Sequence, residues 1–312
     1  MSEDGSQLPE CVPHLFPELT AEKHKGQAGR VGVIGGSEEY TGAPYFAAVT
    51  AMKVGADQAH VFCAKDASVV IKSYSPDLIV HPTLDGKTAE KDISSLFERL
   101  SVLIVGPGLG RTDATLKTVE SLIKAARELE LPIVIDADGL WLVNQKPEVI
   151  KGYQKAILTP NLMEAKRLWI ALKLPEDQWD KKAASVKKMS QQLGNVGLIV
   201  KGPRDIFSDG VRVLESSEEF GLKRCGGQGD IMSGAVGVFY SWALQMEKEN
   251  ANAVLKKFGP VCCAAYAASL LTRRCSRLAF EELGRSMLAS DMLKKIPQVV
   301  NEMQGTLSKK KS

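Results

Sequence analysis

Five short apolar segments recur along this chain, and each runs into a glycine-rich or polar turn. Segments that read as helices lie between them. Strands that are apolar along their whole length are covered on both faces, and strands that alternate with helices form parallel sheets. The sequence therefore predicts the α/β fold class, as a three-layer α/β/α arrangement with a mostly parallel central sheet. The five segments are 30–34, 102–105, 132–135, 156–158 and 197–200.

Two further patterns complete this fold. Short apolar runs flank Ser208-Asp209-Gly210, which predicts a small hairpin at the edge of the sheet. Residues 259–274 are mostly apolar, so we expect a helix buried in the core. We find no internal repeat and no linker. We therefore expect one catalytic domain over 30–304, after an irregular N-terminal segment, 1–29, and before a basic C-terminal tail, 305–312.

The composition excludes several classes of protein. Over 312 residues, 44% are hydrophobic and 25% are charged, as in soluble globular enzymes. The net charge of +3 gives no sign of a nucleic-acid partner, and Lys309-Lys310-Lys311 reads as a solvated tail. No apolar stretch looks long enough to cross a bilayer, so we expect no membrane partner. An acidic N-terminus without an apolar run, and six cysteines without a Cys-x-x-Cys pair, favour a cytoplasmic location.

The most informative stretch runs from Lys223 to Gly237, where Gly226, Gly227 and Gly229 precede a helix of small residues. Glycines let the backbone turn sharply and approach a ligand closely. A helix that begins there presents unpaired N–H groups and the positive end of its dipole. The stretch therefore predicts an anion site, for which phosphate is the usual ligand. It is not a P-loop, because no lysine follows the glycines.

Asp230 follows these glycines directly, although a carboxylate repels bound phosphate. It makes chemical sense as a base that accepts the proton of an arriving hydroxyl group. The alternative is that Asp230 only caps the helix, which is a common role for aspartate. The residues alone leave both roles open.

Polar or glycine-rich residues stand at the predicted carboxyl ends of the strands, where open parallel sheets bind ligands. They are 35–37, 106–111, 136–138, 159–161 and 201–202. The glycines of 106–110 do not fit the dinucleotide-binding Gly-x-Gly-x-x-Gly pattern, and they also read as a rigid turn. Five such matches in sequence favour a ligand site at this edge of the sheet.

Each of these polar residues also has a purely structural interpretation. Asn161 can be a helix N-cap, and Glu164 can form a weak surface pair with Arg167, three residues further along the helix. Asp136 and Asp138 can bind Mg²⁺ or accept hydrogen bonds from the backbone of a tight turn. Lys201 can neutralise the phosphate of a nucleotide or lie in solvent. Taken singly, the residues do not choose between these interpretations.

Taken together, the motifs resemble the ribokinase-like superfamily. Within it, the chain resembles the ATP-dependent (S)-NAD(P)H-hydrate dehydratase family, from about residue 23 to the last helix. The Gly-Gly-x-Gly-Asp piece alone supports only the superfamily, whereas the full set is specific. The matching stretches are 24–30, 39–46, 74–77, 105–111, 135–140, 159–164 and 225–234.

This resemblance implies a reaction that begins as a kinase and ends as a lyase. The substrates are the hydrated forms of NADH and NADPH (NADHX and NADPHX), which carry a hydroxyl group on C6 of the nicotinamide ring. ATP phosphorylates this hydroxyl, and expulsion of phosphate then restores NAD(P)H. The resemblance also implies Mg²⁺ as a cofactor and a functional pairing with an NAD(P)H-hydrate epimerase. We expect ATP rather than ADP because the likeness to eukaryotic members is closer, and a homo-oligomer is left open.

The resemblance also assigns roles to residues, with Asp230 as the catalytic base and metal ligands unknown. The hydrate-binding residues it implies are Gly108, Asn161, Leu162, Met163, Glu164, Ala165, Lys166, Arg167 and Asp230. The ATP-binding residues it implies are Lys201, Gly202, Pro203, Arg204, Asp205, Phe220, Gly221, Leu222, Lys223, Arg224, Cys225, Gly226, Gly227, Gln228 and Gly229.

Two alternative functions fit parts of the sequence. A small-molecule kinase of this fold, acting on a vitamin precursor or a sugar, would release a stable phosphate ester. A nucleotide sensor without catalysis would need the glycine turn but not Asp230. The nature of the products separates the first alternative, and nucleotide binding without turnover would indicate the second.

Overall fold

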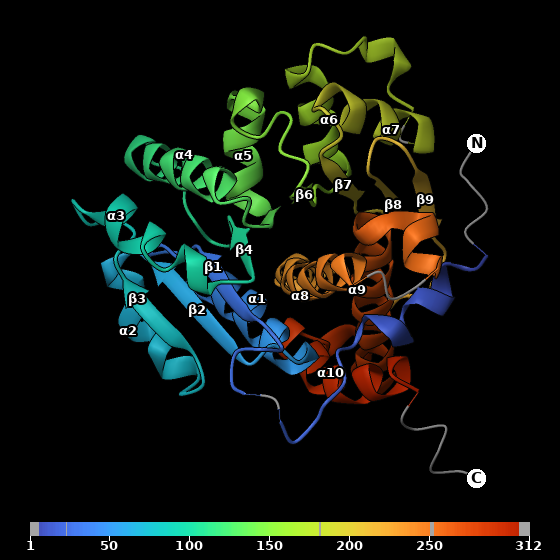
Figure 1. Cartoon of the computed structure of the whole chain (residues 1–312), viewed down its shortest axis with the longest axis horizontal. Coiled ribbons are helices and arrows are strands. Elements are labelled where there is room, and N and C mark those ends of the chain that lie inside the picture. The colour runs from blue at the N-terminus through green and yellow to red at the C-terminus, as the bar shows by residue number, and fades with distance from the viewer. Residues whose placement is uncertain (1–5, 23, 181, 250–252, 306–312) are drawn as a thin grey trace.

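The computed structural model describes residues 6–22, 24–180, 182–249 and 253–305. Within them, one nine-stranded sheet has the order β3-β2-β1-β4-β5-β6-β7-β8-β9 (Figure 1). Strands β1 to β7 are parallel, and β8 and β9 are antiparallel to their neighbours. The strands are β1 Arg30–Ile34, β2 Gln58–Cys63, β3 Ile79–Pro82, β4 Val102–Val105, β5 Ile133–Ile135, β6 Ala156–Leu158, β7 Gly197–Val200, β8 Asp205–Ser208 and β9 Val213–Ser216.

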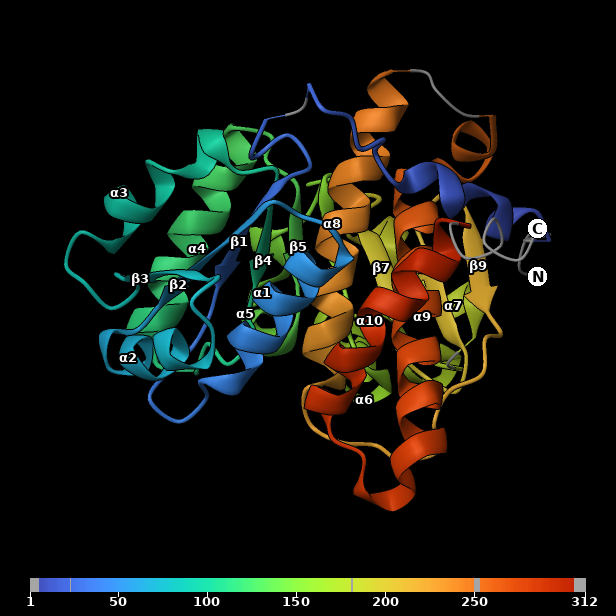
Figure 2. The same ribbon diagram turned by 90° about the horizontal axis from the view of Figure 1, so that it is seen from below.

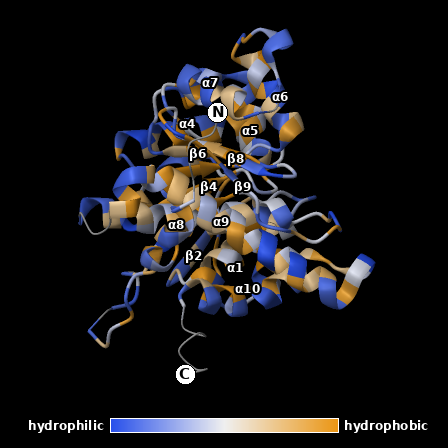
Figure 3. Cartoon of the chain, turned by 90° about the vertical axis from the view of Figure 1, so that its right-hand side faces the viewer, coloured by the Kyte–Doolittle hydropathy of each residue, from blue (hydrophilic) through white to orange (hydrophobic). Residues whose placement is uncertain are grey.

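Helices cover both faces of this sheet and bury a separate apolar core on each side (Figures 1 and 2). One face carries α1 Gly42–Val54, α2 Lys65–Tyr74, α8 Gln228–Lys248, α9 Ala253–Leu283 and α10 Ala289–Met303. The other carries α3 Ala89–Ser94, α4 Asp113–Glu128, α5 Ala137–Gln145, α6 Leu162–Ala171 and α7 Ala183–Gln192. Apolar residues concentrate between the layers, while the outer helix faces are largely polar (Figure 3). The predicted three-layer fold is confirmed.

The strand bounds follow directly from the apolar runs. Strands β4 and β7 are buried along their whole length, because a helix lies over each face. The predicted edge hairpin is formed by β8 and β9. Strand β3 carries no long apolar run, and its first residue, Ile79, is 37% exposed at the free edge of the sheet. It ends at Pro82, a residue that sheets accept at such edges.

The order of the strands reverses between β1 and β4. Ligands bind beside such a switch point, beyond the carboxyl ends of the strands. Two turns meet there, because the Gly36 amide donates to the carbonyls of Pro107 and Gly108, at 3.1 Å each. The fold therefore places the predicted strand-end residues along one edge of the sheet.

The described part of the N-terminal segment contributes to the core. It forms two short 3-10 helices, Leu8–Cys11 and Pro13–Leu15, and its side chains Leu8 and Leu15 are only 1% exposed. The prolines do prevent a long helix, as the sequence predicts. The segment nevertheless packs against α9, and its buried side chains belong to the apolar core on that face of the sheet. Residues 306–312 of the predicted basic tail lie outside the described residues.

Helix α9 has a sharp kink at Gly259, where φ is 74° and ψ is 159°, directly before Pro260. By length and composition this helical segment could cross a membrane, so the expectation that no stretch is long enough was wrong. However, 72% of its most apolar 18-residue window is buried inside the protein, as in the core helix of a globular domain.

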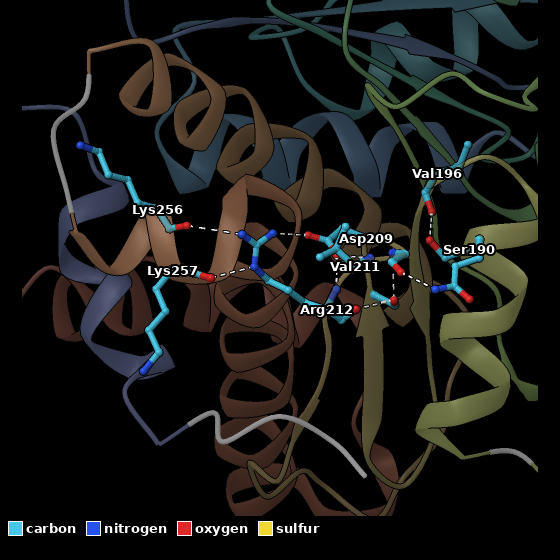
Figure 4. A network of polar contacts seen from close by, with 10 residues as sticks. Ser190, Val196, Asp209, Val211, Arg212, Lys256 and Lys257 are labelled. Atoms are coloured by element: carbon cyan, nitrogen blue, oxygen red, sulfur yellow. Dashed lines mark hydrogen bonds and ion pairs between the residues drawn. The ribbon is translucent and has the colours of Figure 1, made fainter.

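The hairpin is fastened to the start of α9 at this kink. The Arg212 guanidinium pairs with Asp209 at 2.7 Å and donates to the carbonyl of Lys257 at 2.7 Å (Figure 4). A side chain on Gly259 would lie 2.9 Å from this guanidinium. The kink therefore makes room for the contact that joins the sheet edge to the core helix.

Candidate active site

The glycine turn has a conformation that only glycine tolerates well. Gly227 is the N-cap of α8, with φ at 93°. A Cβ atom there would lie 2.7 Å from the Cβ of Ala289 and 3.0 Å from the ring of Phe46. A Cβ on Gly226 would instead meet nothing within 4 Å. The turn is therefore packed against neighbouring side chains at Gly227 and open at Gly226. An open side of this kind leaves room for a ligand next to the backbone.

The first turn of α8 begins with amides that have no carbonyl partner inside the helix. The bond from the Ile231 amide to the Gly227 carbonyl, 3.0 Å long, closes the first turn of the helix. The amides that precede Ile231 have no carbonyl behind them in the helix, which is the usual situation at a helix start. This end of the helix dipole attracts negative charge. The local structure thus has the features of the predicted phosphate cradle.

Asp230 stands in this first turn with a strongly perturbed carboxyl group. Burial is the largest cause, and together with the nearby Asp136 carboxylate it raises the pKa of Asp230 to about 7. Lys201 opposes this rise but does not cancel it. A carboxyl group with a pKa near neutrality is a much stronger base than an ordinary aspartate. The N-cap of α8 is Gly227, so Asp230 does not hold the cap position, although its carboxylate accepts a hydrogen bond from its own backbone amide.

Lys201 and Asp136 form an ion pair beside Asp230. The Nζ–Oδ1 distance is 2.8 Å, and the side chains are 20% and 3% exposed, respectively. Burial disfavours the charged ammonium group, but Asp136 outweighs it and the pKa of Lys201 is raised. Burial also raises the pKa of Glu164, which lies near this lysine. Lys201 therefore lies among carboxylates rather than in open solvent.

The backbone fixes Lys201 in this position. Its amide donates to the carbonyl of Pro160 at 2.8 Å, and a parallel bridge joins Asn161 to Lys201 beyond the ends of β6 and β7. A Cβ on Gly229 would lie 3.3 Å from Nζ of Lys201. Residues that are far apart in the sequence thus meet at the carboxyl edge of the sheet.

Asn161 is the N-cap of α6, as its structural interpretation predicts. Its Oδ1 accepts from the amides of Met163 and Glu164, at 2.9 and 3.0 Å, and Glu164 in return accepts from the Asn161 amide at 2.8 Å. The rest of this predicted hydrate-binding stretch points in several directions. Met163, Lys166 and Arg167 are exposed, Leu162 is half-buried and Ala165 is buried in the core.

Asp138 stabilises the turn that contains Gly108. Its carboxylate accepts hydrogen bonds from the Gly110 amide at 3.0 Å and from Arg111 Nε at 2.7 Å. The interpretation that Asp138 accepts hydrogen bonds from the backbone of a tight turn is therefore correct. Gly108 has φ at 60° and packs against the carbonyl of Tyr40. Between the two aspartates, Ala137 has φ at 47°, which is unusual for a residue with a side chain. This left-handed residue separates the carboxylate that holds Lys201 from the one that holds the glycine loop.

A cavity of about 520 Å³ opens on the β6–β8 side of the glycine turn. Most of the predicted ATP-binding residues line it, and so does Asn161, which was predicted on the hydrate side. The lining residues expected from the sequence are Asn161, Lys201, Gly202, Pro203, Asp205, Phe220, Arg224, Cys225, Gln228 and Gly229. Those that line no part of it are Arg204, Gly221, Leu222, Lys223, Gly226 and Gly227.

Helices α8, α9 and α10 complete the cavity with residues to which the sequence assigns no binding role. They are Met232, Thr272, Arg273, Ser276 and Met292. Three of these five come from α9, at and just beyond the end of the mostly apolar helix that the sequence predicts over 259–274. The available signal was the presence of polar residues in such a helix, since buried polar groups need partners.

Arg273 and Asp205 form a buried clamp at the floor of this cavity. Both residues are 5% exposed. The Asp205 carboxylate accepts from Arg273 Nε and Nη2 at 2.8 Å, from Ser269 at 2.7 Å and from the Gly202 amide at 3.0 Å. Arg273 also donates to the carbonyls of Gly202 and Pro203. Because its donors are engaged in this way, the clamp shapes the 202–205 loop rather than binding phosphate itself.

Phe220 lies between two guanidinium groups on the cavity wall. The Cζ atoms of Arg224 and Arg273 are 4.0 and 4.9 Å from its ring centroid. Burial, followed by repulsion from Arg273, lowers the pKa of Arg224. Arg224 is exposed and has only one hydrogen bond among the described residues, to the Gly221 carbonyl at 3.0 Å, so it can turn toward an anion.

Comparison with known proteins gives a consistent result. Residues 31–298 match the family model described as NAD(P)H-hydrate dehydratase. The chain is 47% identical over 295 residues to an ATP-dependent (S)-NAD(P)H-hydrate dehydratase of Rattus norvegicus, covering 95% of this chain and 85% of the relative. It is 51% identical over 288 residues to the protein of the same description from Pongo abelii, covering 92% and 86%.

Solved structures show the same fold. An ADP/ATP-dependent NAD(P)H-hydrate dehydratase of Bacillus subtilis, co-crystallised with ATP and Mg²⁺, superposes with a TM-score of 0.70 at 20% identity, covering 95% of this chain and 97% of that one. A ribokinase-like superfamily protein of Enterococcus faecalis superposes with a TM-score of 0.75 at 19% identity, covering 95% and 94%.

Proposed function

This chain belongs to the NAD(P)H-hydrate dehydratase family, and on that premise we propose how its site performs the reaction. The chain is an ATP-dependent lyase that removes water from hydrated NADH and NADPH and so repairs these cofactors. The observation that carries this function is the identity of about half of all residues with relatives of that one activity, over more than nine-tenths of the chain. The alternative of a vitamin-precursor or sugar kinase has no comparable support.

The chemistry requires activation of a poor leaving group. Hydroxide does not leave C6 readily, whereas phosphate does. We infer that the C6 oxygen attacks the γ-phosphorus of ATP, with loss of its proton to Asp230 and release of ADP. The nitrogen lone pair of the ring then expels phosphate, and C5 releases a proton to solvent as the C5–C6 double bond forms. The products NAD(P)H, ADP, phosphate and a proton balance the reactants.

The geometry supports a division of the site by the glycine turn. ATP occupies the cavity on the β6–β8 side, where the 202–205 loop and the Arg273 clamp give it a formed wall. Its γ-phosphoryl group lies at the start of α8, where the amides stabilise the charge that develops during transfer. Lys201 adds a positive charge there. Asp230, in the same helical turn, receives the hydroxyl proton.

Mg²⁺ is part of this proposal only as a companion of ATP. In the part of the chain that the structure describes, no group of three or more His, Cys, Asp or Glu side chains could hold a metal ion. The residues therefore offer no preformed metal cage. Mg²⁺ usually reaches such sites bound to substrate phosphates with few protein ligands. No step above is assigned to Mg²⁺.

The decisive experiment is incubation of the protein with hydrated NADH, Mg²⁺ and either ATP or ADP. We expect the absorbance of reduced nicotinamide to return with ATP, together with ADP and free phosphate in equal amounts. A phosphorylated product that accumulates would instead support the kinase alternative. Nucleotide binding without turnover of any hydrate would support a sensor.

We propose an NAD(P)H-hydrate epimerase as the functional partner. The relatives are specific for the S form, as their names state. On that basis an unresolved mixture of R and S hydrate should be consumed only to the extent of its S form, and added epimerase should drive it to completion. Complete consumption without epimerase would remove the need for this partner. A cytoplasmic location and a homo-oligomer also stay proposals, for which fractionation and sedimentation are the tests.

Asp136 influences the pKa of the proposed base, Asp230, so its replacement should change the pH dependence of the reaction. Its negative charge raises the pKa of Asp230, whereas Lys201 lowers it. In Asp136→Asn, the repulsion is lost and Lys201 is released toward Asp230. We therefore expect the acid limb of kcat/KM to move to lower pH than in the wild type, whatever happens to the maximal rate. A limb that stays in place or moves upward would contradict the assigned coupling.

A further inference from the structure

Three aromatic side chains run outward from the glycine turn in continuous contact. The site of a Cβ atom on Gly227 lies 3.0 Å from the Phe46 ring. The ring centroids of Phe46 and Tyr45 are 5.6 Å apart, and those of Tyr45 and Tyr74 are 5.2 Å apart. We call Phe46, Tyr45 and Tyr74 the aromatic strip. It connects the start of α8 with the end of α2, through the first turns of α1.

The strip is partly open to solvent and yet ordered. Tyr74 is 44% exposed, and Phe46 and Tyr45 are only half-buried. The Tyr74 hydroxyl and the Thr41 hydroxyl lie 2.8 Å apart, which fixes the outer ring. Both ring pairs meet at 61° rather than stacking, so the rings do not cover one another face to face. Aromatic side chains that are open in this way can stack with a flat ring, as they do with the bases of nucleic acids.

The position of the aromatic strip indicates which of the two substrates it can contact. The glycine turn lies between the ATP cavity, which Cys225, Gln228 and Gly229 line, and Phe46, which packs against Gly227. In phosphoryl transfer, the attacking oxygen approaches opposite the leaving oxygen. The hydrate must therefore enter from the side away from the ATP cavity. That is the side of α1 and α2, where the strip lies.

The substrate is a dinucleotide, so its two ring systems need separate places. When the nicotinamide end reaches Asp230, the rest of the molecule extends away from the glycine turn. From this arrangement we propose that the aromatic strip, with Tyr74 as its outer ring, binds the adenine of the NADHX or NADPHX substrate. This inference rests on the proposed function and assigns a subsite to the half of the substrate that does not react.

The test removes the outer ring and the adenine separately. Hydrated reduced nicotinamide mononucleotide is the truncated substrate, since it keeps the reacting ring and lacks the adenylate. We expect Tyr74→Ala to lower kcat/KM for hydrated NADH about 10-fold, which is the usual size of the loss of one base stack. For the mononucleotide hydrate the same variant should match the wild type. The KM for ATP should not change.

Two matched variants make the result specific. Tyr74→Phe keeps the ring but loses the hydroxyl contact with Thr41, and it should retain most of the preference for the dinucleotide. Val69→Ala removes a side chain on the same helix that is 74% exposed and outside the strip, and it should behave as the wild type. If Tyr74→Ala lowers kcat/KM equally for both substrates, the adenine assignment is wrong. It is also wrong if the variant changes only the self-association of the protein, because this face would then be a protein–protein contact.

A binding measurement separates this inference from the proposed function. NADH and reduced nicotinamide mononucleotide are fluorescent, so their binding can be followed without any turnover. Wild-type protein should bind NADH more tightly, and Tyr74→Ala should lose most of that advantage. Absence of turnover with both hydrates would contradict the proposed function alone. Equal binding of both nucleotides by the wild type would overturn the subsite.

Discussion

Replacing Asp230 with asparagine should lower kcat by about 10²–10⁴-fold, the usual contribution of a general base. The amide has nearly the same shape, so the glycine turn and the ATP cavity should persist. It cannot accept the hydroxyl proton in the way that a carboxylate does. We therefore expect the variant to bind ATP with nearly unchanged affinity, measured by calorimetry, while dehydration of hydrated NADH is almost lost. Near-full turnover by Asp230→Asn would exclude the base role.

The same variant should be more stable than the wild type at and above neutral pH. The pKa of Asp230 rises from 3.8 to about 7 on folding, mainly because the carboxyl group is buried. Between these values the folded protein holds a proton that the unfolded chain releases, so this group lowers the free energy of unfolding as the pH rises. The full cost, at most about 4 kcal/mol, is present above pH 7. Asparagine removes it.

Denaturant midpoints at pH 8 and pH 5 check this sign. The stabilisation of Asp230→Asn should be largest at pH 8 and should shrink as the pH falls toward 4. Asp113→Asn is the matched control, because Asp113 also lies in the first turn of a helix but is exposed. It should change neither kcat nor the pH dependence. In the wild type, kcat/KM should fall as the pH drops through about 7. A stability gain that is equal at both pH values would contradict burial as the cause.

The second large effect concerns the buried pair Arg273–Asp205 in the proposed ATP cavity. Arg273→Met should lower the free energy of unfolding by about 3–5 kcal/mol, because it leaves the Asp205 carboxylate buried without its counter-charge. Asp205 is only 5% exposed, so solvent cannot replace the lost partner. The 202–205 loop also loses the bonds from Arg273 to its carbonyls. We therefore expect the KM for ATP to rise as well, at temperatures where the variant is folded.

The next residue on α9 supplies a control. Arg274 pairs with Glu218 at 2.9 Å, but the two side chains are 31% and 21% exposed. Pairs near the surface contribute about 1 kcal/mol or less. Arg274→Met should therefore be mild, and urea unfolding of both variants measures the difference. If the two substitutions destabilise the protein equally, the clamp does not have the assigned role.

The fold was largely predictable because its strands are buried on both faces. A run such as 102–105 can only be a central strand when glycine follows and a helix pattern comes next. The edge strand β3 escaped notice because one side of it is open, which relaxes the demand for apolar residues. The buried side chains of the N-terminal segment were also not predicted, because burial of isolated residues between prolines leaves no periodic pattern.

The residues of the site were predictable where a charged side chain comes directly after a buried strand. Asp136 and Lys201 come immediately after buried strands, so the sheet itself brings them together. Arg273 could not be found in that way. It lies in a helix whose sequence reads as core, and its role depends on a partner 68 residues away in the chain. A contact of this kind is decided by packing between layers, which no local pattern encodes.

The left-handed residue Ala137 joins two aspartates that hold different parts of the site. On one side of it, Asp138 holds the loop of Gly110 and Arg111, next to Gly108, which is predicted to bind the hydrate. On the other side, Asp136 holds the lysine that lowers the proton affinity of the base. A shift of the loop by an incoming dinucleotide would therefore travel through three consecutive residues to the charge that governs Asp230. Arrival of the damaged cofactor and readiness of the base would then be a single event, which would limit wasteful cleavage of ATP while the hydrate is absent.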